Sequence, residues 1–457
     1  MNTIVAVSTA PGVGGIGIIR MSGEKTFEIL DKIFIQKNKK DISKINGYTI
    51  KYGNIVDGDI IVDEVLVSYF KAPKSYTTED MCEINSHGGM VVVKKILQLC
   101  LENGAELALS GEFTKRAFLN GRIDLSQAES VIDIINAKSE KESNEAMKQL
   151  KGFLSKEILN IKKELLEVIS NIEVSIDYPE YDTPELSTDL LKIGFSNIRL
   201  KLQKLLKSFD NGKILKEGVK TAIIGKPNVG KSSLLNTILK EERAIVTEYE
   251  GTTRDTIEEF VNINGIPLKL VDTAGIRESK DVIEKIGIEK SKKIAEEADL
   301  IIAIFDTSRC LDEEDYDILD IVKKKKSIIL FNKIDLEENF KKEDIKKFED
   351  LKENIIKIST VDGTGIEELY NRIKEMFDLS EISLDNDVMI TNERHKNLID
   401  KAIKDLNKAE ESLDFNMPID IVEISLRDVL SDLQSITGEE VGEEILNEIF
   451  ARFCLGK

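Results

Sequence analysis

Hydrophobic residues follow two different periods along the chain. In the first 118 residues, short apolar runs with strand spacing alternate with turns, at Thr3 to Ser8, Gly17 to Met21, Tyr48 to Val56 and Glu64 to Phe70. Apolar residues from Met90 to Glu102 recur instead at helical spacing. This pattern predicts a small α+β module at residues 1–118.

Helical spacing dominates the following residues. It continues to Ile135, and then covers Met147 to Ile172, Leu190 to Leu206, Thr391 to Leu413 and Pro418 to Thr437. A break at Asp177 to Tyr181 contains Pro179 and separates two of these helices. We expect an all-α domain in two segments, 119–217 and 379–457, because their apolar faces can then pack together around an insertion.

The inserted stretch, residues 218–378, alternates apolar strands with amphipathic helices. Strands are predicted at Thr221 to Ile224, Pro267 to Val271, Ser327 to Phe331 and Ile355 to Ile358, and helices at Ser233 to Leu239 and Ile366 to Phe377. This alternation is typical of an α/β domain. Ligands of such a domain bind at the carboxyl ends of its strands.

A glycine-rich loop follows the first of these strands. Residues Gly225 to Ser232 read GKPNVGKS and match GxxxxGK[ST], in which backbone N–H groups meet phosphate oxygens at a helix N-terminus. Lys231 is expected to reach the β and γ phosphates, and Ser232 to bind Mg²⁺. On its own, the match could also be a simple glycine turn.

Three later motifs favour the phosphate loop. The segment Gly251 to Asp255, GTTRD, offers a threonine hydroxyl to Mg²⁺, and Asp272 to Gly275, DTAG, offers a carboxylate near Mg²⁺ and a glycine N–H near the γ-phosphate. Asn332 to Asp335, NKID, ends a strand, and its Asp335 can accept both N1–H and N2–H of guanine. Ser359 is expected to support the base. Together these motifs predict GTP binding.

The catalytic groups are less obvious. Many GTPases have a water-orienting glutamine after the DxxG glycine, but this chain has Ile276 there. Glu278, Asp281 and Glu284 are the candidate replacements, and each is equally compatible with an ordinary surface acid. The Asn228 amide can ligate a monovalent cation beside the phosphates, or it can simply shape the loop.

Two motifs of the N-terminal module have structural explanations. Gly12 to Gly17 spells GxGxxG, but an apolar strand follows it rather than a helix, so we predict a tight turn between strands. His87-Gly88-Gly89 is predicted to be a helix-entry turn with a hydrogen-bonded histidine. Glu83 alternates with apolar neighbours, which favours a position in a pocket.

Composition narrows the function. A formal charge of −20 argues against broad attraction to nucleic acid, although a local basic patch or a basic partner can still contact RNA. The four cysteines and two histidines are scattered without CxxC spacing, which argues against a zinc site or a disulfide framework. No apolar stretch is long enough for a bilayer span and no signal precedes the module, so we expect a cytoplasmic protein without membrane contacts. Cys454 lies near the C-terminus and has two possible roles. It can be buried as a small hydrophobic residue, or it can form a polar site with Lys457.

The chain resembles the MnmE (TrmE) family of tRNA-modification GTPases from end to end. The resemblance is carried by PGVGGIGIIRMSG, YTTEDMCEINSHGG, GEFTKRAFLNGRIDLSQAE, DYPEYD, the four nucleotide motifs and the terminal FCLGK. It implies an N-terminal tetrahydrofolate-binding and dimerisation domain, a discontinuous all-α helical domain and an inserted Ras-like P-loop GTPase domain.

The resemblance also implies roles for individual residues. GTP would be bound by Asn228, Val229, Gly230, Lys231, Ser232, Ser233, Thr247, Glu248, Tyr249, Glu250, Gly251, Thr252, Thr253, Asp272, Thr273, Ala274, Gly275, Asn332, Lys333, Asp335 and Ser359. Mg²⁺ would be held by Ser232 and Thr253, and K⁺ by Asn228, Thr247, Tyr249 and Thr252. Glu284 would orient the hydrolytic water and Cys454 would matter for modification. The folate would contact Arg20, Glu83, Arg122 and Lys457, where Arg122 occupies a position at which the family also has lysine.

The family's activity gives the expected function. A potassium-activated GTPase homodimer would act with the flavoprotein MnmG, which carries FAD, in a heterotetramer-like complex. The complex would place an aminomethyl-type (carboxymethylaminomethyl) group on C5 of the wobble uridine, U34, of certain tRNAs. The one-carbon carrier would be 5,10-methylenetetrahydrofolate or 5-formyltetrahydrofolate.

The competing interpretations are a regulatory switch, such as a ribosome-assembly GTPase, and a dynamin-like mechanical GTPase. A ribosome-assembly GTPase usually carries a basic RNA-binding appendage, and none is visible in the sequence. A dynamin-like GTPase needs an amphipathic or basic segment that faces the membrane, and none is visible either.

Overall fold

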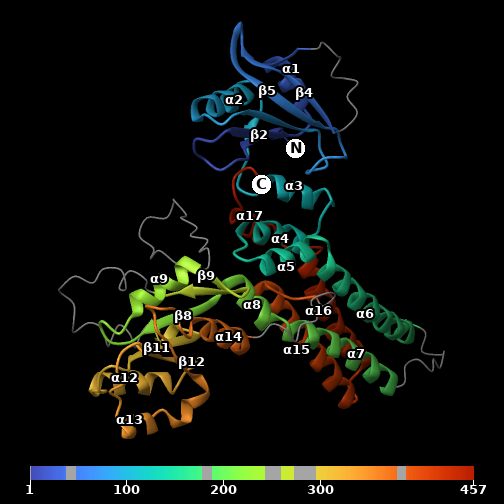
Figure 1. Ribbon diagram of the computed structural model, residues 1–457. Coiled ribbons are helices and arrows are strands. Elements are labelled where there is room, and N and C mark those ends of the chain that lie inside the picture. Colours follow the sequence, from blue (N-terminus) through green and yellow to red (C-terminus); the bar gives the residue numbers. More distant parts are fainter. Residues whose placement is uncertain (1, 38–47, 178–187, 242–258, 272–294, 378–387) are drawn as a thin grey trace. The chain divides into compact units, whose positions relative to one another are not determined.

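The structure is a computed structural model of the 457-residue chain, and it describes residues 2–37, 48–177, 188–241, 259–271, 295–377 and 388–457 (Figure 1). The chain forms two compact units. The first contains Met1–Ile135, Met147–Arg199 and Leu398–Lys457, and the second contains Asn136–Ala146 and Leu200–Asn397. No helix within the described ranges is long and apolar enough to cross a membrane.

The N-terminal part of the first unit is built on a seven-stranded sheet in the order β3-β4-β5-β6-β2-β1-β7. Its strands are β1 (Ile4–Val7), β2 (Ile16–Ser22), β3 (Phe34–Gln36), β4 (Thr49–Asp57), β5 (Ile60–Phe70), β6 (Met81–His87) and β7 (Glu106–Leu107). Neighbouring strands are antiparallel except β1 and β7. The α+β module predicted from the strand spacing is confirmed.

Two helices cover one face of this sheet. Helices α1 (Thr26–Ile33) and α2 (Met90–Glu102) pack their apolar stripes on a core that includes Ile19, Met21 and Ile84. Because side chains alternate along a strand, the residues between these core positions face the other way. Arg20 and Glu83, which are register partners on β2 and β6, therefore lie on the opposite face of the sheet.

The GxGxxG stretch connects two strands, as predicted. Strands β1 and β2 pair antiparallel, with Val7 opposite Ile19, and residues 8–15 between them contain no helix. The connection is longer than the tight turn that we expected. His87 ends β6, Gly89 caps α2, and the His87 ring nitrogen Nδ1 lies 2.7 Å from Asp63 Oδ1, so the predicted helix-entry turn with a bonded histidine is also confirmed.

The rest of the first unit is helical. Its helices are α3 (Glu112–Leu119), α4 (Leu125–Asn136), α5 (Glu140–Leu150), α6 (Phe153–Asp177), α7 (Thr188–Lys207), α15 (Glu393–Asp414), α16 (Ile419–Thr437) and α17 (Glu443–Ala451), some of which extend into the second unit. Helix α6 packs against α16, and α17 packs against α3 (Figure 1). Segments far apart in sequence thus share one core, which confirms the discontinuous helical domain.

One predicted helix is wrong in its extent. The apolar spacing from Met147 to Ile172 suggested a continuous helix, but α5 ends at Leu150 and α6 begins at Phe153. Gly152 lies between them with φ of 80°, a left-handed conformation that favours glycine and ends a helix. The predicted break at Asp177 to Tyr181 begins where α6 ends, at Asp177, and its other residues lie outside the described ranges.

The second unit contains a six-stranded sheet in the order β13-β12-β11-β8-β10-β9. The strands are β8 (Val219–Ile224), β9 (Glu259–Ile263), β10 (Ile266–Leu270), β11 (Leu300–Asp306), β12 (Ser327–Asn332) and β13 (Ile355–Lys357). Only the β9–β10 pair is antiparallel. Strand β11 was not predicted, although all seven of its residues are buried.

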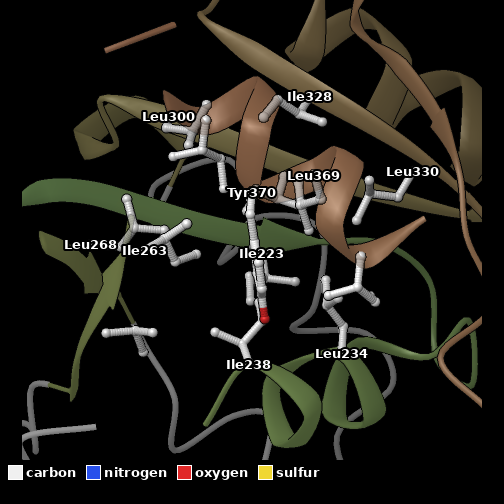
Figure 2. Packing of buried hydrophobic residues seen from close by; sticks show 14 of the residues in the cluster. Ile223, Leu234, Ile238, Ile263, Leu268, Leu300, Ile328, Leu330, Leu369 and Tyr370 are labelled. Atoms are coloured by element: carbon white, nitrogen blue, oxygen red, sulfur yellow. The ribbon is translucent and has the colours of Figure 1, made fainter. Parts of the chain in front are cut away.

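Helices cover both faces of this mainly parallel sheet. Helices α9 (Lys231–Glu241) and α14 (Ile366–Met376) share one core with Ile223 and Leu330, as Figure 2 shows. Helix α12 (Glu313–Val322) shares another core with Ile224 and Phe331 on the opposite face. Helices α8 (Phe209–Glu217) and α13 (Lys342–Lys346) also belong to this unit. Consecutive strand residues thus enter different cores, as expected for an α/β domain.

Candidate functional site

The glycine-rich loop of the second unit runs from the end of β8 to the start of α9 at Lys231. Gly225 and Gly230 have backbone φ angles of 153° and 109°, which residues with a side chain rarely adopt. A Cβ on Gly230 would lie 2.2 Å from Nδ2 of Asn332, the last residue of β12, so the loop and the end of this strand approach too closely for a side chain at position 230. The strand, loop and helix have the arrangement of a phosphate-binding loop.

Lys231 is the cation of this loop. Its Nζ donates hydrogen bonds of 2.7 Å to the backbone oxygens of both Gly225 and Lys226. Burial lowers the pKa of Lys231 from 10.5 to about 8, because the charged form loses hydration. The ammonium is thus held within the loop, and any anion that binds there favours the protonated form of Lys231.

The loop after β12 holds the predicted base-reading residues. Asn332 is buried, donates from Nδ2 to Val229 O at 2.7 Å, and accepts from Thr360 N at 3.3 Å. Asp335 is exposed, and one of its carboxylate oxygens accepts from Ser359 Oγ at 2.8 Å. The structure therefore joins the phosphate loop to a carboxylate supported by Ser359, both at the carboxyl edge of the sheet.

Some of the other predicted nucleotide residues are also described. Val229 is buried, Asn228 is exposed with a φ of 62°, and Ser232 and Ser233 are exposed in the first turn of α9. Ser232 thus presents a hydroxyl beside the loop, a suitable ligand for Mg²⁺. The remaining residues lie outside the described ranges: Thr247, Glu248, Tyr249, Glu250, Gly251, Thr252, Thr253, Asp272, Thr273, Ala274, Gly275 and Glu284.

A second cluster of polar residues lies in the first unit. Arg20 donates to Glu83 Oε1 from Nε at 3.0 Å and from Nη2 at 2.8 Å, across neighbouring strands. The two side chains are only 13% and 21% exposed, so the pair is largely removed from water. Half-buried charges of both signs can bind a ligand that carries both donors and acceptors.

The C-terminus of the chain reaches this pair. Gly456 O accepts from Arg20 Nη1 and from Ser8 Oγ, both at 3.1 Å. Gly456 has φ of 85°, and a Cβ there would lie 2.5 Å from Val7 O, so only glycine fits. The pKa of Lys457 is lowered by burial and by the Arg20 charge, and Glu83 opposes this, which brings the terminal lysine into the same charged cluster.

An aromatic ring links the remaining predicted residue to this cluster. The Arg122 guanidinium carbon lies 4.5 Å from the Tyr76 ring centroid, and that of Arg20 lies 5.5 Å from the same centroid. The Tyr76 hydroxyl is 2.9 Å from Thr114 Oγ1. Cys454 is exposed with a free thiol, and its backbone oxygen accepts from Gly111 N at 3.4 Å. All four predicted folate residues therefore belong to one cluster.

Sequence reasoning missed Tyr76 and Gly456 as parts of this cluster. Tyr76 begins the YTTED motif. The sequence around it does not show whether its ring lies in the core or contacts two guanidinium groups. Gly456 had a clearer signal, since a glycine between polar terminal residues often marks a close backbone approach. Both depend on contacts between segments far apart in sequence.

A phosphate loop tied to an NKxD loop at the carboxyl edge of a doubly wound sheet defines a P-loop GTPase. Two family models match the chain: the MnmE helical domain over residues 125–454, and the GTP-binding protein TrmE N-terminus over residues 3–122. The chain belongs to the MnmE family of tRNA modification GTPases.

Full-length relatives agree with this assignment. The tRNA modification GTPase MnmE of Acetivibrio thermocellus is 51% identical over 460 residues, which cover 100% of this chain and 99% of the relative. The protein of the same name from Clostridioides difficile (strain 630) is 50% identical over 456 residues, with coverage of 100% and 99%.

Solved structures with similarity include Era in complex with MgGDPNP and 16S ribosomal RNA nucleotides, with 32% identity, a TM-score of 0.26, and coverage of 34% of this chain and 56% of that chain. The G domain of the T. maritima FeoB iron transporter has 27% identity, a TM-score of 0.24, and coverage of 34% and 97%. TM-scores this low do not bear on the fold.

Proposed function

We propose that this chain is a potassium-activated GTPase that acts with the flavoprotein MnmG to install a carboxymethylaminomethyl-type group at C5 of the wobble uridine U34 in certain tRNAs. Membership of the family makes it a GTP hydrolase that takes part in tRNA modification. The observation that most supports the finer proposal is that one chain carries both a P-loop and the cluster of Arg20, Glu83 and Lys457.

GTP is the substrate of the second unit in this proposal. Lys231 neutralises phosphate charge, and its present hydrogen bonds to loop carbonyls keep its ammonium in the loop before the nucleotide arrives. Asn332 fixes the base-reading loop to the phosphate loop through Val229. Asp335 accepts the two guanine N–H donors, an arrangement that adenine cannot match. Ser232 and Thr253 would hold Mg²⁺, which supplies charge neutralisation between phosphates.

Potassium activation is supported by the residues available near the phosphate loop. Asn228 is exposed and has an amide oxygen suited to a hard monovalent cation. A cation beside the phosphates stabilises developing negative charge as an arginine finger does. Thr247, Tyr249 and Thr252 would complete its coordination. Glu284 would orient the hydrolytic water, since Ile276 cannot.

The cluster in the first unit is proposed to bind 5,10-methylenetetrahydrofolate or 5-formyltetrahydrofolate. A pterin ring offers N–H donors to the Glu83 carboxylate, and a glutamate tail offers carboxylates to Arg20, Arg122 or Lys457. The folate supplies the one-carbon unit. Tyr76 keeps two guanidinium groups beside one ring and so limits their orientations. Cys454 lies next to this cluster, and we propose that it contributes to modification without assigning it a covalent step.

The two halves of the function would be coupled by GTP hydrolysis in a cytoplasmic homodimer. Contacts of the γ-phosphate hold two switch segments in one state, and hydrolysis releases them, which changes the relative populations of conformations. FAD belongs to MnmG in the heterotetramer-like complex, so redox chemistry is assigned to the partner and the one-carbon carrier to this chain.

Hydrolysis rates in matched salts test the potassium proposal. GTP hydrolysis by the purified protein should be much faster in KCl than in NaCl at equal ionic strength, and Asn228→Ala should remove most of this difference. Ser233→Ala, in the first turn of α9 and not among the proposed K⁺ ligands, is a comparison variant for general damage to the nucleotide site. Equal rates in the two salts would refute the cation role of Asn228.

A further inference from the structure

The base-reading loop, defined as residues 332–335, is held by neighbours on three sides. Asn332 donates to the phosphate loop, and Asp335 accepts from Ser359. On the third side, the Lys333 ammonium donates to Asp306 Oδ2 at 2.6 Å. The residues on the first two sides already have nucleotide roles in the proposal above, but Asp306 has none.

Asp306 is a fixed and buried anion. It is the last residue of β11 and is only 5% exposed. Its Oδ1 accepts from Ser308 N at 3.0 Å and from Ser308 Oγ at 2.6 Å, which leaves Oδ2 for the lysine. Burial alone would raise the pKa of Asp306, but hydrogen bonds from Lys333 and Ser308 outweigh it and lower the pKa. The carboxylate therefore stays ionised at neutral pH.

Lys333 needs such an anchor. Its φ is 67°, a left-handed conformation that is unfavourable for residues other than glycine. The backbone beside it is held from the same segment, because Thr307 N and Oγ1 both donate to Asn332 O at 3.0 Å. Three bonds from Asp306 and Thr307 thus keep the start of the base-reading loop in one conformation.

We propose that Asp306 is a positioning residue for guanine recognition. By holding the Lys333 ammonium, it keeps the base-reading loop in the strained conformation that aims Asp335 at the guanine N1–H and N2–H donors. This inference rests on the proposed GTP-binding function. It assigns a role in base selectivity to a residue at the end of β11, a strand that carries none of the predicted nucleotide residues.

The test uses the full-length protein and two nucleotides, GDP and IDP. IDP lacks the 2-amino group of guanine, so the ratio of the two affinities reports how well Asp335 is placed. Asp306→Asn keeps the shape and the Ser308 bonds but removes the charge that holds Lys333. The matched control is Asp299→Asn, because Asp299 lies just before the other end of β11 and accepts from Lys220 N at 3.1 Å.

We expect Asp306→Asn to weaken GDP binding about tenfold, the effect of losing one charge-assisted hydrogen bond. The preference for GDP over IDP should fall, while kcat at saturating GTP stays within about twofold because the phosphate loop is intact. Asp299→Asn should match the wild type in all three measurements. An unchanged GDP:IDP ratio in Asp306→Asn would overturn the inference.

A double variant tests the same pair even where Asp306→Asn folds poorly. Asp306→Asn with Lys333→Met has no unpaired buried charge, and we expect it to bind GDP as Lys333→Met does. A further tenfold loss in the double variant would show that Asp306 acts independently of Lys333 and would also overturn the inference. A wild-type protein that binds neither nucleotide would instead refute the proposed GTP-binding function.

Discussion

Nucleotide binding should be coupled to protonation of Lys231. With its pKa lowered to about 8 by burial, this ammonium is about half protonated at pH 8 in the free protein. Bound phosphates favour the charged form, so the pKa rises and the site takes up a proton. We expect an uptake of roughly 0.5 proton per GDP at pH 8, about 0.1 at pH 7 and about 0.9 at pH 9.

GDP affinity should fall as pH rises, because Lys231 loses the charge that the phosphates favour. Affinity for GDP should be nearly constant between about pH 6.5 and pH 7 and should fall as pH rises through 8, by about tenfold between pH 7 and pH 9. The GDP phosphates do not contribute, because their last pKa is near 6. The assay is isothermal titration calorimetry in two buffers of different ionisation enthalpy, from which the proton uptake is obtained directly.

Lys231→Arg is the control, because arginine stays charged over this pH range. It should bind GDP more weakly than the wild type and should show proton uptake close to zero at pH 8. The reasoning would be refuted by a wild-type uptake near zero at pH 8 and pH 9, or by an equal uptake in Lys231→Arg.

Three further predictions concern single residues. Asp335→Asn should weaken GDP and improve xanthosine diphosphate, because an amide can donate to the xanthine carbonyl, and competition binding with an unchanged ratio would refute the assignment. Gly230→Ala should weaken GDP binding more than about thirtyfold, because the new Cβ displaces Asn332 and strains the loop; fluorescence titration within threefold of the wild type would contradict this. Gly456→Ala should abolish binding of 5-formyltetrahydrofolate at equilibrium dialysis without slowing GTP hydrolysis, because its Cβ would overlap a carbonyl of β1. Gly442→Ala, where a Cβ meets open space, is its control, and equal folate binding by both variants would count against the docked C-terminus.

The nucleotide site was predictable because its signals are local. The phosphate loop begins at Gly225 directly after β8, Asn332 is the last residue of β12, and the carboxyl ends of parallel strands meet at one edge of the sheet. Asp306 occupies the same kind of position at the end of β11 and could have been found by the same rule. Strand β11 is as continuously apolar and buried as β12, which was predicted, and it was overlooked because no nucleotide-binding motif follows it.

The cluster in the first unit was not predictable from local patterns. Strand alternation indicates that Arg20 and Glu83 avoid the core, but their pairing requires β2 and β6 to be neighbours across 63 residues of sequence. Lys457 and Gly456 join them from the far end of the chain. Such long-range pairing depends on the whole fold, and only the family resemblance brought these residues together in advance.

Nucleoside analysis of tRNA tests the central claim most directly. We expect mass spectrometry of tRNA from cells that lack this chain to show unmodified uridine at the wobble position of tRNAs that normally carry a carboxymethylaminomethyl-type group. Expression of the wild-type chain should restore the modification, and the Lys231→Ala variant should not. Full modification of U34 in the absence of the chain would contradict the account.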